Sequence, residues 1–231
     1  MATLDVLSSG RVELGLGAGW MRDEYEAIDL PFDRPGTRVG RLEESVILVK
    51  ELFGDAPVSH TGKHYRICAV DGLPKPVQRP HPPLLIAGGS RRVLTLAGRE
   101  ANIAGVNPSL RGGATGADLL ADMSPQRLKE KVAWIRDGAR SADRNPDEVE
   151  LQLSLLSCRI ARSRASTHAR SSLLGTADTE MLETSPAVLH GSVEQCIDQL
   201  EERRERYGFS YIKFGGDPEA VAPIVDRFAG R

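Results

Sequence analysis

Two glycine-rich turns in the sequence have the residue types that bind a phosphorylated cofactor. The sharper one is Gly88-Gly89-Ser90, which lies between an apolar strand pattern and a helix pattern. Free backbone N–H groups and the helix dipole favour an anion at such a point, and the Ser90 hydroxyl can donate to it. Arg91 or Arg92 would supply positive charge. We interpret this turn as a phosphate site, against an ordinary tight turn with Ser90 as an N-cap and both arginines in solvent.

The second turn is GLGAGW, residues 15–20, at the end of the strand pattern 12–17. Its spacing resembles the dinucleotide fingerprint G-x-G-x-x-G, but Trp20 stands where the third glycine belongs. Two prolines delay the main helix to about residue 38, so no helix begins inside the glycine loop. A Rossmann site is therefore excluded. Two interpretations stay open: a ligand that approaches the backbone, or a crowded strand end that needs small residues. Trp20 either stacks on a ring or packs.

A valine at position 89 is expected to be harmful, through a backbone clash and a positive φ. His60 and His64 have the spacing of a zinc pair, but Gly62 between them indicates a hairpin turn, so we assign no metal site. His190 precedes a capping box formed by Ser192 and Gln195, and we expect it in a loop. No Ser-His-Asp order, phosphate-binding Walker loop or pair of carboxylates stands out.

Strand and helix patterns alternate along the chain, which predicts a parallel sheet with helical connections. The architecture is either an open doubly wound sheet or part of a (β/α)8 barrel. Ser124-Pro125 is typical of a helix start, with Ser124 as its N-cap. We treat residues 1–231 as one domain, with an irregular, hairpin-containing insertion at 55–83 and a weakly patterned loop region at 161–191. The expected strands cover residues 12–17, 84–90, 101–106, 149–161 and 211–216.

The composition is that of an ordinary globular protein. The chain of 231 residues has 30 basic and 32 acidic residues and a net charge of -2, which gives no electrostatic case for nucleic acid or an anionic membrane. Its apolar runs are far shorter than a membrane span. The three cysteines are far apart and form no CxxC pair, which is typical of reduced thiols in a cytoplasmic protein.

Five segments in order resemble the luciferase-like oxidoreductases, most closely the branch that uses the deazaflavin coenzyme F420. They are LDVLSSGRVELGLGAGW, EYEAIDLPFDRPGTRVGRLEESV, GKHYRI, PKPVQRPHPPLLIAGGSRRVLTLAGREANIAGVN and GSVEQCIDQLEERRERYGFSYIKF. The resemblance implies a (β/α)8 TIM barrel with its cofactor at the C-terminal face and hydride transfer to or from a small organic substrate. It places Gly17, Ala18, Gly19 and Trp20 beside the cofactor ring. It places Gly88, Gly89, Ser90 and Arg91 at the cofactor phosphate.

The chain departs from the family pattern at its start. Family members have three further strand-helix units before the LDVLSSGR segment, so we expect only about the last five units here. No catalytic residue is assigned, because the usual acid/base group lies in those units. A late start assignment, a true truncation and completion by another copy or chain all stay open. So do FMN-dependent monooxygenation and a truncated, non-catalytic cofactor-binding or assembly module. A complete barrel is expected to form a homodimer.

Overall fold

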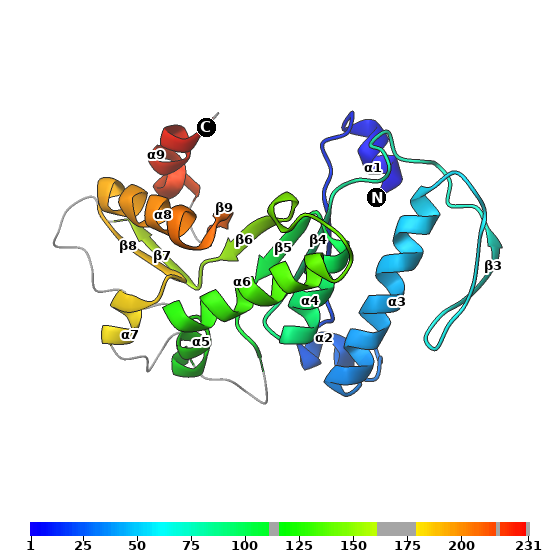
Figure 1. Cartoon of the computed structure of the whole chain (residues 1–231), viewed down its shortest axis with the longest axis horizontal. Coiled ribbons are helices and arrows are strands. Elements are labelled where there is room, and N and C mark those ends of the chain that lie inside the picture. Colours follow the sequence, from blue (N-terminus) through cyan, green and yellow to red (C-terminus); the bar gives the residue numbers. More distant parts are fainter. Residues whose placement is uncertain (111–115, 161–178, 216–217, 230–231) are drawn as a thin grey trace.

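The computed structural model describes residues 1–110, 116–160, 179–215 and 218–229. Five strands form one parallel sheet in the order β1-β4-β5-β6-β9. The inner strands β4 and β5 are each followed by helices, as the alternating pattern predicts, whereas β6 is followed by a further strand (Figure 1). The strands are β1 (Leu14–Leu16), β4 (Leu84–Gly88), β5 (Ile103–Val106), β6 (Glu150–Ser154) and β9 (Phe209–Lys213).

Helices pack against one face of this sheet. Side chains such as Leu84, Ile86 and Val106 are fully buried there, while the alternating residues Leu85 and Ala87 point to the other face and are only partly buried. The shared core contains residues from all the elements involved. The helices are α3 (Pro35–Phe53), α4 (Arg91–Glu100), α6 (Pro125–Arg140) and α8 (Val193–Tyr207). One-sided helical cover is the arrangement of a barrel wall, because a doubly wound sheet has helices on both faces.

The sheet is strongly curved. Tyr211 of β9 donates its hydroxyl to a carboxylate oxygen of Glu13 at 3.4 Å, and Glu13 directly precedes β1. These two strands are at opposite ends of the five-stranded order, so in a flat sheet they would be about 19 Å apart. The contact therefore requires the sheet to curl toward the face that no helix of the described ranges covers. That concave face carries Gly15, Gly105 and the buried Gln152.

The sequence pattern at 149–161 predicts one strand, and this prediction is wrong. The chain forms β6 and then β7 (Ser157–Ile160), which pairs in parallel with β8 (Val188–Gly191) in a separate sheet. The backbone N–H of Leu155 donates to Lys213, whereas that of Leu156 donates to Ala187. Hydrogen-bond partners thus change between these two residues, although the apolar pattern runs on unbroken.

The weakly patterned region 161–191 contains α7 (Thr179–Thr184) and β8, so the expected loop is wrong for these segments; residues 161–178 lie outside the described part of the chain. Two short helices, α2 (Arg22–Ala27) and α5 (Gly116–Asp122), precede the longer helices α3 and α6. α6 begins at Pro125 as predicted, but the Ser124 side chain does not cap it. The Ser192–Gln195 capping box of α8 is confirmed. The remaining elements are α1 (Ala2–Leu7), the 3₁₀ turn η1 (Pro146–Glu148) and α9 (Pro218–Phe228).

The predicted hairpin is formed by β2 (Val58–Thr61) and β3 (Arg66–Val70), and a carboxylate ties it to α3. Glu44 accepts hydrogen bonds from the His60 ring at 2.9 Å and from the backbone amides of His64 at 2.9 Å and Tyr65 at 2.8 Å. His60 is thus bound to a carboxylate on the helix. Burial tends to raise the pKa of Glu44, but these hydrogen bonds outweigh it and hold the pKa below its ordinary value.

A carboxylate whose pKa falls on folding stabilises the protein above its ordinary pKa, here 4.5, and loses that effect as the pH drops. Glu44→Gln is therefore expected to lower the denaturation midpoint at neutral pH, with a difference from wild type that shrinks below pH 4.5. Urea unfolding over a pH series measures it. Glu51→Gln, an exposed change of the same kind on the same helix, is the matched control. If the difference in stability between wild type and Glu44→Gln stays constant with pH, the stabilising role of the ionised Glu44 carboxylate is contradicted.

None of the helices in the described ranges is long and apolar enough to cross a membrane. The thiols are free, with Cys68 exposed, Cys158 half-buried and Cys196 buried.

Candidate functional site

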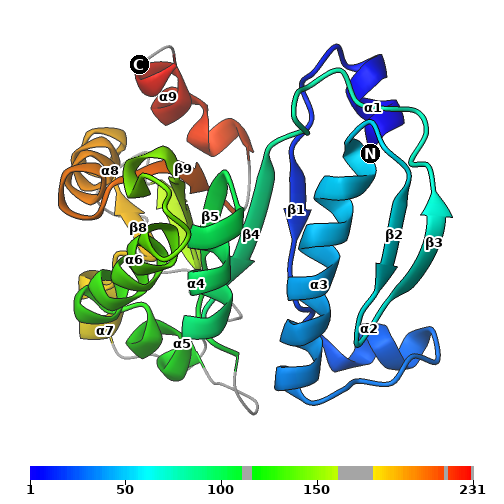
Figure 2. The same cartoon turned by 45° about the vertical axis from the view of Figure 1, so that its right-hand side comes forward.

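The fold brings the two glycine turns together. Residues 17–20 follow β1 and residues 89–91 follow β4, and these strands are adjacent and parallel, with Leu16 in register with Ile86. Both turns therefore leave the sheet at its C-terminal edge, the edge where α2 lies in Figure 2. A Cβ on Gly17 would lie 3.7 Å from the backbone oxygen of Ala87, which measures how close the two strand ends are. Local sequence patterns do not show this adjacency, since 70 or so residues separate the turns.

The first turn borders open space on the concave side. A Cβ on Gly15 would meet nothing within 4 Å, and one on Gly17 would touch only the Ala87 oxygen. Ala18 is half-buried against the core. Trp20 is 60% exposed, so its indole is not held by packing. An exposed indole beside an uncovered, side-chain-poor surface is suited to stacking on a flat ring.

Gly19 is the one residue of this turn that needs to be glycine for its backbone. Its φ is +72°, and a Cβ there would lie 2.1 Å from the Tyr25 hydroxyl. The Arg38 guanidinium donates to the Gly19 carbonyl and lies over the Phe32 ring, 3.9 Å from its centroid. Tyr25 contacts the same ring edge-on at 5.1 Å. α2 and α3 therefore fix the turn through residues that sequence reasoning missed, and no spacing signal marked them.

At the second turn the Ser90 hydroxyl is the N-cap of α4 and accepts from the Val93 amide at 3.4 Å. The amides of Arg91 and Arg92 have no partner among the described residues, so the helix end presents two free donors. The guanidinium of Arg92 donates to Glu43 and Gly36, and the hydrogen bond to Glu43 raises its pKa. Arg91 is exposed and makes no ion pair in the described part of the chain. Arg91 is therefore the available cation at this turn.

Gly89 is glycine because another loop touches it. A Cβ at this position would lie 2.4 Å from both the Pro108 carbonyl carbon and the Ser109 nitrogen. The expectation of a positive φ is wrong, because Gly89 is absent from the left-handed residues of the chain, whereas the backbone clash is confirmed. The clash is with the loop after β5 rather than with a ligand. Asn107 belongs to this loop, and its backbone N–H donates to the Gly88 carbonyl at 3.0 Å.

The residues present fit a cofactor with a flat ring and a phosphate. The open concave surface at Gly15 and Gly17 is the kind of cradle that side chains would otherwise fill. The free amides at the start of α4 and the exposed Arg91 suit an anion. Since the two features leave adjacent strands, a single molecule can contact both.

Other candidates do not join this site. His190 lies in β8, not in a loop, and its Nε2 is 2.8 Å from the Ser157 hydroxyl; burial lowers its pKa. A cavity of about 260 Å³ lies between β9, α8 and α9, at the other end of the strand order from the turns. In the described ranges, no three His, Cys, Asp or Glu side chains are grouped to hold a metal ion.

The chain matches the family model described as "Luciferase-like monooxygenase" over residues 1–210. It is 33% identical to the FMNH(2)-dependent dimethylsulfone monooxygenase of Pseudomonas putida over 99 residues, 43% of this chain and 27% of the relative. It is 35% identical to the F420-dependent hydroxymycolic acid dehydrogenase of Mycobacterium tuberculosis over 98 residues, 42% of this chain and 26% of the relative. The matched part thus spans about a quarter of each of these curated relatives.

A solved F420-dependent secondary alcohol dehydrogenase, in complex with an F420-acetone adduct, has the same fold. The superposition has a TM-score of 0.76 at 17% identity and covers 98% of this chain and 71% of that one. This likeness and the family match confirm the predicted fold class, the luciferase-like (β/α)8 barrel, of which the described residues supply a five-stranded wall.

Proposed function

Because the chain belongs to the luciferase-like monooxygenase family, we propose that it is an oxidoreductase that uses coenzyme F420 for hydride transfer to or from a small organic substrate. The observation that carries the proposal is the adjacency of the two glycine turns at the C-terminal edge of β1 and β4. When bound, the deazaflavin ring would supply or accept the hydride. F420-dependent enzymes among the relatives support this choice.

In this proposal each turn has its own task. Gly17, Ala18, Gly19 and Trp20 form the ring side, where the exposed indole stacks and the glycines let the ring approach the backbone. Gly88, Gly89, Ser90 and Arg91 form the phosphate side, where the first amides of α4 and one guanidinium face the anion. Arg38 and Tyr25 keep the ring-side turn in its left-handed conformation.

FMN-dependent monooxygenation is the second candidate. The Pseudomonas putida relative is named for FMNH(2), and its identity to this chain is similar to that of the F420-dependent one. Both cofactors present a tricyclic ring and a phosphate to the two turns. Parallel titrations of the purified protein with F420 and with FMN, each followed by fluorescence, decide between them. Tighter binding of F420 supports the proposal, tighter binding of FMN favours the second candidate, and binding of neither overturns both.

Ser90→Asp tests the phosphate side of the site. Aspartate caps helices as well as serine does, so stability should be unchanged. Its charge would face the phosphate at the same helix end, and we expect the affinity for FMN to fall by about tenfold or more, with the affinity for riboflavin unchanged. Ser90→Asn is the matched control, because it caps without adding charge. Unchanged binding of FMN and F420 by Ser90→Asp would remove Ser90 from the site.

A further inference from the structure

A lysine side chain is completely buried close to the proposed phosphate turn. Lys131 of α6 has 0% of its side chain exposed, and its ammonium donates to Asp122 at 2.6 Å and to the Asn107 carbonyl at 2.8 Å. A buried charge that is merely paired does little for stability, because desolvation offsets most of the attraction. Stability alone therefore does not explain why a lysine is buried at this position.

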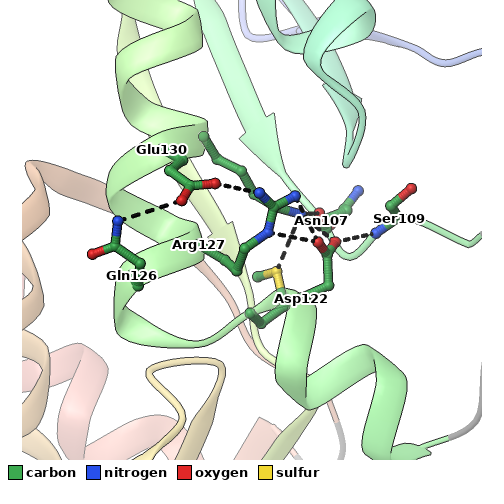
Figure 3. Close-up of polar contacts among 8 residues, drawn as sticks. Asn107, Ser109, Asp122, Gln126, Arg127 and Glu130 are labelled. Atoms are coloured by element: carbon green, nitrogen blue, oxygen red, sulfur yellow. Dashed lines mark hydrogen bonds and ion pairs between the residues drawn. The ribbon is translucent and has the colours of Figure 1, made fainter.

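The partners of Lys131 form a complete network. Asp122 uses one carboxylate oxygen for Lys131 and for the Ser109 amide, which donates at 2.7 Å. Its other oxygen accepts from the Arg127 guanidinium at 3.0 and 3.2 Å. Figure 3 shows Asp122 between Arg127 and the Ser109 backbone. Burial tends to raise the pKa of Asp122, but the ammonium and the amide outweigh it and keep the carboxylate ionised.

This network holds the loop at residues 107–109 from both sides. Lys131 binds the carbonyl of Asn107, and Asp122 binds the amide of Ser109. The same loop lies directly on the phosphate turn: the Asn107 amide donates to Gly88 at 3.0 Å, and the Pro108–Ser109 backbone passes 2.4 Å from where a Gly89 Cβ would be. A continuous path of hydrogen bonds and close contact thus runs from the buried ammonium to the turn.

We propose that Lys131 and Asp122 are positioning residues, which lock the 107–109 loop against Gly88-Gly89 and thereby hold the turn in the shape that receives the cofactor phosphate. The inference rests on the proposed function. Neither side chain touches the cofactor in this arrangement. The loss of either should therefore affect the phosphate part of binding and leave the ring part intact, because the ring-side turn depends on α2 and α3 instead.

The test compares a cofactor with and without its phosphate. In Lys131→Met we expect the affinity for FMN to fall about tenfold while that for riboflavin stays within about twofold of wild type. If wild type prefers F420, the pair is F420 and its phosphate-free deazariboflavin. Lys50→Met is the matched control: it breaks a Lys–Glu pair between α3 and α4, 2.9 Å long, that does not contact the loop, and it should change neither affinity.

If Lys131→Met fails to fold, Asp122→Asn, which keeps the side-chain volume, carries the same comparison. An equal loss for FMN and riboflavin would show a merely structural role and overturn the inference, as would no loss for either. A wild-type protein that binds the phosphorylated and phosphate-free forms equally well would overturn the proposed phosphate site itself, and the inference with it.

Discussion

Gly98→Ala is expected to destabilise the protein by about 2 kcal/mol, although alanine is the better helix former by about 1 kcal/mol. Gly98 lies in α4 where α4 crosses α6, and a Cβ there would be 1.9 Å from the Ile135 carbonyl oxygen. Gly138 of α6 lies opposite, and a Cβ there would be 2.2 Å from the Thr95 carbonyl oxygen. Both obstacles are backbone atoms, so no side-chain rotation relieves the overlap and the two helices must separate.

Urea unfolding of Gly98→Ala measures this effect, and Gly36→Ala is the control. Gly36 is exposed in the first turn of α3, with nothing within 4 Å of its Cβ position, so alanine there should be neutral or slightly stabilising. Equal stability of wild type and Gly98→Ala would mean that the helices are not in backbone contact. Because α4 begins at the phosphate turn, a shifted α4 should also weaken cofactor binding.

Sequence patterns predicted those structural features that are determined by residues close together in the chain. The change in the spacing of apolar residues places Ser90 between a strand and a helix. The Ser192–Gln195 capping box is predicted by two residue types three positions apart. The adjacency of the glycine turns needed the order of the strands, which the family resemblance supplied and local pattern did not. Within the structure, the one-sided helical cover and the Tyr211–Glu13 contact argue against a doubly wound sheet.

The misses have a common physical origin, the identity of a distant partner. The pattern 149–161 continues across Leu155-Leu156 because β6 is largely buried and β7 partly buried. The hydrogen-bond partners of these two residues, Lys213 and Ala187, lie 30 or more residues downstream. As a residue type, Lys131 cannot be told from an ordinary lysine on the surface of a helix. Its one signal was spacing: it follows Leu128 by three positions and precedes Ile135 by four, on the apolar face of α6. A charge on that face indicates a buried partner.

Gly89→Ala is expected to have the second large effect, on binding and on stability together. The new Cβ would overlap the Pro108–Ser109 backbone at 2.4 Å, so either the turn or the loop must shift. We expect the free energy of unfolding to fall by about 2 kcal/mol. We expect the affinity for the phosphorylated cofactor to fall by about tenfold or more. Gly36→Ala in α3, outside the proposed cofactor site, is again the control, since its Cβ position has nothing within 4 Å.

The double variant Gly89→Ala with Lys131→Met separates a shared loop from two independent defects. If both residues act by holding the 107–109 loop against the turn, the second change adds little once the first has displaced the loop, and the double variant loses less affinity for FMN than the two single losses combined. Additive losses would mean that Gly89 and Lys131 act on the phosphate turn through separate contacts. Because the hydrogen bond from Asn107 to Gly88 joins the two regions, the coupling should be strongest for phosphorylated ligands and absent for riboflavin.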